Sequence, residues 1–221
     1  MSTSLARKPT YPTVQKLLSG SGTYTTPAGC TWIRVRMVGG GGGGESNSTN
    51  GSMPAAGTGG TTTFGTSLLT APGSAYTGGA APTVNSPAVS IVTLAGGAGQ
   101  GPGQYFQNTV NNQMNCNGGA GAYSPFGGAG RSSSTSSGTA AIANTGSGGG
   151  GAGYGLGGTG PMYMGQGGGS GAYLEAVIFG PSTSYAYSVG TGGAGGAAGT
   201  GGSGTGGNGG SGVIIVEEFY N

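Results

Sequence analysis

The residue types that usually carry catalysis are scarce in this chain. It contains no His and no Asp. The acidic residues are Glu45, Glu175, Glu217 and Glu218, and the cysteines are Cys30 and Cys116. A Ser–His–Asp triad cannot be built without His and Asp, and a zinc site needs Cys, His or carboxylates clustered at suitable spacing. The sequence therefore predicts no enzymatic activity, no metal and no cofactor.

The glycine-rich runs do not match a phosphate-binding loop. No G-x-x-x-x-G-K-[ST] motif occurs, and no glycine motif is followed by a helical pattern. Between residues 46 and 174 the only charged residue is Arg131, whereas nucleic-acid binding calls for a basic patch or Arg-Gly-Gly repeats. The chain is therefore not expected to bind nucleic acid.

The two cysteines leave two options open. A disulfide between Cys30 and Cys116 is one option, but sequence positions do not supply the Cα–Cα distance that a disulfide requires. Two free thiols is the simpler interpretation. No stretch of about 20 consecutive apolar residues occurs, so no transmembrane helix is expected.

Large side chains between the glycine clusters are the remaining candidates for recognition. Residues 104–117 have the sequence QYFQNTVNNQMNCN, and residues 161–166 have the sequence PMYMGQ. These side chains either cap the glycine segments as apolar plugs or form a binding tip. Exposed aromatic and Met residues on loops held by a rigid scaffold favour a tip. The predicted binding residues on loop tips are Tyr76, Tyr105, Phe106, Asn112, Met114, Met162, Tyr163 and Met164.

The elements that would position these residues begin with strands at both ends of the chain. Residues 31–38 (TWIRVRMV) alternate apolar side chains with Arg34 and Arg36, which predicts a strand with one apolar face. Helical periodicity is absent, and glycine at this density opposes a helix. Further strands are predicted at residues 172–179, 184–189 and 213–220.

The predicted fold is all-β without an α-helix. The N- and C-terminal strands are expected to form a small antiparallel β-sandwich, and the glycine segments are expected to be insertions that project from it. Three of the four acidic residues lie on the closing strands, so Glu175, Glu217 or Glu218 is expected to face Arg34 and Arg36 across the sheet.

Glycine accounts for 59 of the 221 residues and keeps a period of three through residues 190–212. Three residues per turn is the period of the polyproline II helix, which has no internal hydrogen bonds. Buried amides must then pair with a neighbouring segment, and only glycine lets backbones approach so closely. This pattern predicts a bundle of polyglycine II helices. The alternative is a disordered or collagen-like polymer, but collagen needs Gly at every third residue with abundant Pro, and Ala198 and the Pro-poor tracts argue against it.

Residues 1–18 differ from the rest of the chain because they contain no glycine and half of the basic residues. They are either a flexible terminus or an attachment arm that docks on another protein, followed by a glycine-rich domain at residues 19–221. The candidate docking residues in the arm are Arg7, Lys8, Tyr11 and Lys16.

Several stretches resemble the glycine-rich domain of bacteriophage and prophage tail-fibre proteins. They are GSGTYTTPAGCTWIRVRMVGGGGGG (20–44), TTTFGTSLLTA (61–71), SPFGGAG (124–130), YAYSVGTGGAGG (185–196) and GSGVIIVEEFY (210–220). The resemblance covers nearly all of the chain after the arm. The chain is similar, more loosely, to the distal adhesins of T-even-like phages, in which polyglycine II helices pack as a bundle and the loops between them bind the receptor. The glycine-rich region of the anaplastic lymphoma kinase ectodomain has a comparable architecture.

The resemblance implies a receptor-binding protein at the tip of a tail fibre in the virion, assembled in the host cytoplasm. Its partners would be another tail-fibre or tail protein, bound through the arm, and a bacterial outer-membrane protein or surface glycan. The chain has only a short arm and no long shaft, so it is either mounted on another fibre protein or self-associates, for example as a homotrimer. The alternative function is a structural fibre cap or tail connector that binds no receptor.

Overall fold

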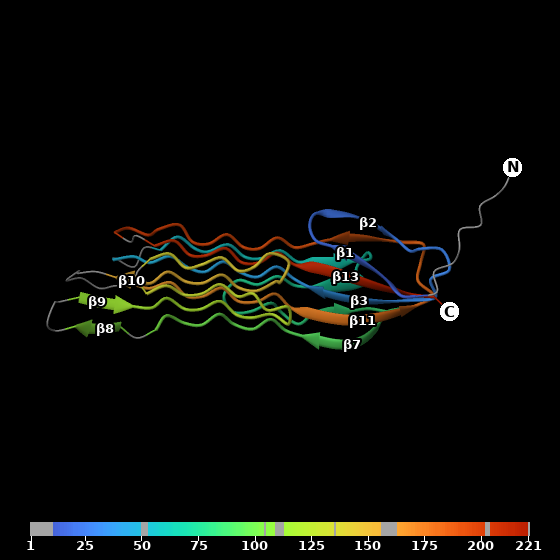
Figure 1. Cartoon of the computed structure of the whole chain (residues 1–221), viewed down its shortest axis with the longest axis horizontal. Helices are drawn as coiled ribbons and strands as arrows, with labels where there is room; N and C mark the ends of the chain where they lie inside the picture. The colour runs from blue at the N-terminus through green and yellow to red at the C-terminus, as the bar shows by residue number, and fades with distance from the viewer. Residues whose placement is uncertain are drawn as a thin grey trace.

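The computed structural model describes residues 11–49, 53–103, 105–108, 113–134, 136–155, 163–201 and 204–220, with only the backbone described for residues 105–108, 113–115 and 155. This part of the chain contains strands and no helix, so none is present that could cross a membrane. The strands gather mainly at one end, and glycine-rich segments run from them side by side along the long axis (Figure 1).

The strands at this end form two five-stranded antiparallel sheets packed as a sandwich. The first sheet has the order β1 (Thr13–Leu17), β13 (Val213–Phe219), β3 (Trp32–Val38), β11 (Tyr173–Phe179) and β7 (Val89–Leu94). The second has the order β2 (Ser21–Thr25), β12 (Ser184–Ser188), β4 (Thr62–Phe64), β5 (Leu69–Ala71) and β6 (Thr83–Val84). Strands from both ends of the chain are thus neighbours, which confirms the predicted all-β sandwich.

Four predicted strands are confirmed to within one residue at each end: β3, β11, β12 and β13. Strand β1 was not expected, because residues 13–17 fall in the segment assigned to an attachment arm. It pairs with β13 in antiparallel register, Thr13 opposite Glu218 and Leu17 opposite Ile214. Its alternation of half-buried and exposed residues is that of an edge strand with one face on the core.

The core lies between the two sheets and is built from alternate residues of the central strands. Ile33, Val35 and Met37 of β3 are fully buried, as the TWIRVRMV alternation predicts. From the second sheet, Phe64 meets Tyr24 with ring centroids 5.4 Å apart. Burial of side chains this large contributes about 1.5–3 kcal/mol each, which the glycine segments cannot supply.

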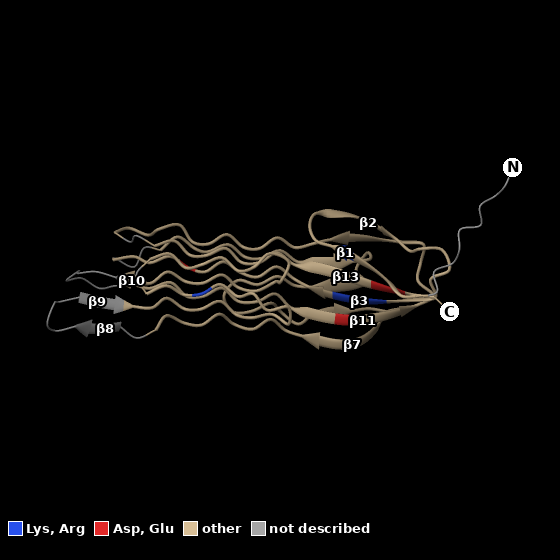
Figure 2. Cartoon of the chain, in the orientation of Figure 1, with Lys and Arg blue, Asp and Glu red and all other residues tan. Residues whose placement is uncertain are grey.

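Charged residues concentrate in the first sheet, on β3, β11 and β13 (Figure 2). Arg34 bonds Glu175 through Nε at 2.6 Å, and Arg36 bonds Glu217 at 2.5 Å. The expected cross-strand ion pairs are therefore present for these two acidic residues. Glu218 was also a candidate, but it lies on the opposite face of β13 and is 1% exposed.

Glu218 is held inside the sandwich by hydroxyl and amide donors instead of by arginine. Its carboxylate accepts a hydrogen bond from the Gln15 amide at 2.6 Å and from the Tyr24 hydroxyl at 2.9 Å. Thr13 donates a further bond to it. Burial, followed by this bond to Glu218, raises the pKa of Tyr24 well above its ordinary value. The carboxylate therefore ties β1 and β2 to β13.

The glycine-rich segments hydrogen-bond to one another in a repeating order. In residues 40–45, successive N–H groups donate to three different neighbours, and every third residue returns to the same one. The bonds are Gly40 to Gly60, Gly41 to Gly210, Gly42 to Gly169, Gly43 to Gly57, Gly44 to Gly207 and Glu45 to Gln166, each 2.8–3.0 Å long. The carbonyl groups of the same run accept hydrogen bonds from further segments, at Ser74, Gly149 and Gly193, so the run has neighbours on all sides.

Close approach explains why residues 39–44 are all glycine. A Cβ atom added at Gly42 would lie well within 3.0 Å of the carbonyl oxygen of Ala75, and one added at Gly43 would meet Ala194 in the same way. The other four positions in this run would also bring a Cβ atom against a carbonyl oxygen of another segment. Real Cβ atoms do not adopt such distances, so an alanine anywhere in the run requires a backbone to move.

Candidate functional site

The end of the molecule remote from the sandwich carries a small third sheet (Figure 1). It has the order β10 (Tyr154–Gly155), β9 (Gln113–Cys116) and β8 (Tyr105–Asn108). Strands β8 and β9 pair antiparallel, with Tyr105 opposite Cys116 and Gln107 opposite Met114. The segment expected to be an irregular loop is therefore a β-hairpin in its described part. Main-chain pairing positions Tyr105, Phe106 and Met114 more firmly than a loop would.

A second group of residues at this end is held by Asn47, which follows the first glycine run. Asn47 is buried, its Nδ2 donates to the Gly153 carbonyl at 2.6 Å, and its Oδ1 accepts from the Gly204 N–H at 2.9 Å. One side chain thus joins three segments. This role was not predicted, and no local pattern around Asn47, which stands three residues after the glycine run, signals it.

Tyr163 lies beside this point. Its backbone pairs with Ser48 through two hydrogen bonds, Tyr163 N–H to the Ser48 carbonyl at 2.9 Å and Ser48 N–H to the Tyr163 carbonyl at 3.0 Å. Its side chain is 42% exposed, and the next side chain, Met164, is half-buried. A partly exposed aromatic ring on a paired backbone can make a contact without a large loss of conformational entropy.

The structure separates Tyr76 from these residues. Tyr76 is 44% exposed, and its carbonyl accepts a hydrogen bond from Gly99. The preceding carbonyl, that of Ala75, accepts the Gly169 N–H, and Gly169 lies only four residues before β11 of the sandwich. Tyr76 therefore does not share the far-end surface. Asn112 and Met162 lie outside the described residues, as do Arg7 and Lys8 of the arm.

The other two candidate docking residues lie at the sandwich end. Tyr11 is 80% exposed, and Lys16 is an exposed residue of β1. The last described residue, Tyr220, is also at this end, with its hydroxyl 2.7 Å from that of Thr13. Both ends of the described chain therefore lie opposite the third sheet (Figure 1).

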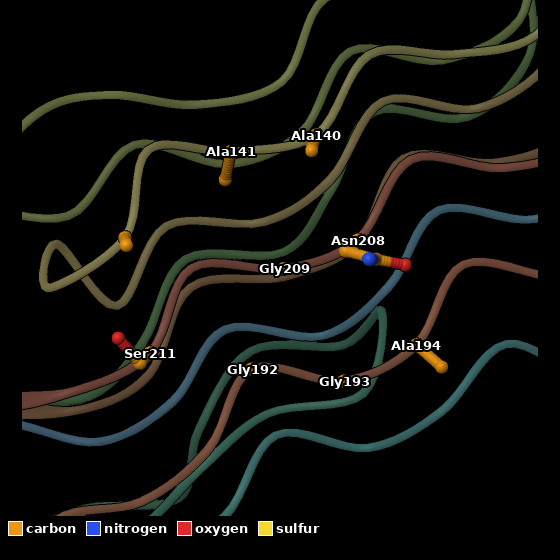
Figure 3. A pocket seen from close by; sticks show the side chains of 9 residues that line it. Ala140, Ala141, Gly192, Gly193, Ala194, Asn208, Gly209 and Ser211 are labelled. Carbon is orange, nitrogen blue, oxygen red and sulfur yellow. The ribbon is translucent and has the colours of Figure 1, made fainter. Parts of the chain in front are cut away.

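A groove of about 420 Å³ opens on the flank of the glycine segments. Figure 3 shows Asn208, Gly209 and Ser211 running between the segment with Ala140 and Ala141 and the segment with Gly192, Gly193 and Ala194. Its lining has no charged and no aromatic residue. The groove therefore offers only backbone groups and small side chains.

The chemically reactive residues do not form a site in the described chain. Cys30 and Cys116 are free thiols, and burial raises the pKa of both, which keeps them protonated and poorly nucleophilic. No group of three or more His, Cys, Asp or Glu residues that could hold a metal ion occurs among the described residues.

No protein-family model matches the chain, and a search of curated proteins finds no match.

Proposed function

We propose that this chain is a receptor-binding protein, an adhesin, at the tip of a phage tail fibre. The observation that carries the proposal is the polarity of the molecule. Both ends of the described chain lie at the sandwich. The third sheet, with β8 and β9, lies at the far end of the glycine segments. Such a molecule attaches at one end and presents a surface at the other.

The glycine segments in this proposal are polyglycine II helices packed as a bundle. The hydrogen bonds of residues 40–45 support this interpretation, since successive donors address three neighbours and the pattern repeats at every third residue. An α-helix would bond within itself, and a strand would alternate between two sides. A period of three without internal bonds is that of the polyproline II geometry. The bundle then acts as a rigid spacer between attachment and recognition.

Recognition is assigned to the far end, through Tyr105, Phe106, Met114 and Tyr163. The receptor is an outer-membrane protein or a surface glycan of the host, both of which present surfaces that aromatic side chains bind. Attachment is assigned to the sandwich end, where Tyr11 and Lys16 are exposed and a tail-fibre protein is the proposed partner. The protein would then function in the virion.

The proposal is tested by adsorption of the purified protein to intact host cells, extracted lipopolysaccharide and outer-membrane proteins. Replacing Tyr105, Phe106 and Tyr163 by Ser is expected to abolish adsorption with unchanged thermal unfolding. The matched control is Tyr123→Ser, because Tyr123 is 73% exposed but lies in a segment bonded to the sandwich half of the bundle. The control is expected to adsorb normally.

The alternative, a fibre cap or connector without a receptor, makes the opposite prediction. Two results together would replace the adhesin proposal by this alternative: the purified protein shows no affinity for cells, and deletion of residues 1–18 prevents particle assembly. Because β1 lies within residues 1–18, the deletion needs a partner variant that keeps the strand. Deletion of residues 1–10 leaves β1 in place and separates loss of docking from loss of folding.

A further inference from the structure

The sandwich has four sheet edges, and three of them carry features that discourage pairing with another chain. Strand β1 has Lys16 on the strand and Pro12 directly before it. Strand β2 contains Gly22, and β6 is only two residues long. Charge, proline, glycine and short length are the devices with which proteins protect exposed edges.

The fourth edge, β7, lacks these features. It has six residues, VSIVTL, with no charge, no proline and no glycine. Val89 is 54%, Ile91 52% and Leu94 48% exposed. A β-bulge lies opposite Glu175 and Ala176, and Ile91 is the extra residue of the strand at this bulge. The side chain at the bulge is therefore also apolar. Among the described residues, no hydrogen bond joins the free side of β7 to another segment.

The order of side chains in β7 is complementary to itself. If two copies of the strand run antiparallel about a point between Ile91 and Val92, Val89 lies opposite Leu94, Ser90 opposite Thr93, and Ile91 opposite Val92 of the second copy. Each pair is apolar with apolar or hydroxyl with hydroxyl. Cross-strand pairs of these kinds stabilise antiparallel sheets.

The two faces of the sheet agree with the same register. Val89 and Leu94 lie opposite Val177 and Tyr173 of β11, on the outer face. Ser90 and Thr93 lie opposite Ala176 and Leu174, which face the core. The pairing would therefore place apolar side chains next to each other on one face and hydroxyls on the other.

We propose that β7 is a self-association site, at which two copies of this chain pair their β7 strands antiparallel and join their first sheets into one continuous sheet. A two-fold axis through the strand pair relates the copies, so the same patch serves on both sides. The glycine segments of the two copies extend in opposite directions from the joined sheet. The proposal rests on the edge strand and not on the proposed adhesin function.

The size of the edge sets the expected strength of the pair. Six residues of strand are about 20 Å long. Such an edge buries less than the roughly 800 Å² per partner of a standard stable interface. The dimer is therefore expected to be in equilibrium with monomer, with a dissociation constant in the micromolar range.

The first test is sedimentation equilibrium of the full chain from about 1 to about 500 µM. The mass is expected to rise from monomer to dimer across this range, and Thr93→Lys, which places a charge on the edge as Lys16 does on β1, is expected to hold it at monomer. Thr23→Lys on the exposed edge β2 is the matched control and should dimerise normally. A chain that stays monomeric throughout, or a Thr93→Lys variant that still dimerises, would overturn the proposal.

The second test measures the register. In a Cys30→Ser, Cys116→Ala background, the Ser90→Cys and Thr93→Cys variants are mixed and oxidised. The expected product is the mixed disulfide, because residue 90 lies opposite residue 93 of the second copy. Two copies of residue 90 would lie about 10 Å apart along the strands, too far for a disulfide. A mixed disulfide that makes up no more than about half of the disulfide product, which is its statistical share in an equal mixture, would show random collision and contradict the register.

Discussion

Two glycine-rich segments of the bundle, residues 39–44 and residues 190–200, follow the same three-residue order but differ in composition. The first is glycine at every position and fully buried. The second has the sequence GTGGAGGAAGT; it is buried at positions 190, 193, 196 and 199 and exposed at 191, 194, 197 and 200, where Thr and Ala stand. The returning segment repeats this order, with Thr205 and Asn208 exposed between the buried glycines 204, 207 and 210.

The difference shows that the number of covered sides decides which residues a segment can contain. At the centre, all three positions of each turn face the backbone of another segment, so none can carry a Cβ atom. At the surface, the third position faces solvent and accepts a side chain. The period of three in the sequence therefore identifies outer segments, whereas an unbroken glycine run identifies the centre of the bundle.

Gly42→Ala is expected to have the largest effect on stability. Its Cβ atom would lie well within 3.0 Å of the Ala75 carbonyl oxygen, in a segment with neighbours on all sides and no room to shift. We expect a loss of about 3 kcal/mol or more in the free energy of unfolding, or failure to fold. Urea denaturation measures this loss. A free energy of unfolding equal to that of the unaltered protein would refute the close approach at Gly42.

Gly193→Ala should have an intermediate effect. Gly193 is also buried, and a Cβ atom there would meet the Gly57 carbonyl oxygen. Its segment is open to solvent on one side, so the backbone can move outward and the cost is expected to be about 1–3 kcal/mol. If Gly193→Ala costs as much stability as Gly42→Ala, then the number of covered sides of a segment does not determine the cost of an added Cβ atom.

Asn208→Ala should have the smallest measurable effect. The side chain is exposed, and its Oδ1 accepts the Gly195 N–H at 2.8 Å. Loss of this bond is expected to cost about 1 kcal/mol or less and to speed hydrogen exchange of the Gly195 amide. Ala194→Ser, at an exposed position without such a bond, is the control and should stay within about 0.5 kcal/mol. Unchanged exchange at Gly195 would show that the bond does not form in solution.

The sandwich could be predicted because its central strands alternate. TWIRVRMV separates a buried face from an outer one by its alternation, and β3 lies at these residues. VIIVEEFY is a run of strand-forming residues without such alternation, so it predicts β13 but does not predict that Glu218 is buried. Strand β1 was missed because residues 1–18 were classified by composition, and because the residue types in TVQKL do not alternate even though their burial does. Short strands such as β5, which is three residues long, carry too little periodicity to be recognised from sequence.

The candidate binding surface was predictable only in part. Unusual residue size singled out Tyr105, Phe106 and Tyr163, and these belong to segments at one end of the molecule. The same criterion selected Tyr76, which belongs elsewhere, because size says nothing about distance along the bundle. The position at which each glycine-rich segment turns depends on its hydrogen bonds to segments that are far apart in the sequence. No local sequence pattern encodes this position.

The hydrogen bonds of the first glycine segment also constrain how the chain can be made. Gly41 donates to Gly210 and Gly44 to Gly207, so this segment is completed by residues near the other end of the chain. During synthesis from the N-terminus, residues 39–44 gain these partners only after residues 207–210 have been made. Contacts this distant in sequence slow folding. We therefore expect that chains truncated before residue 207 do not form a shorter bundle.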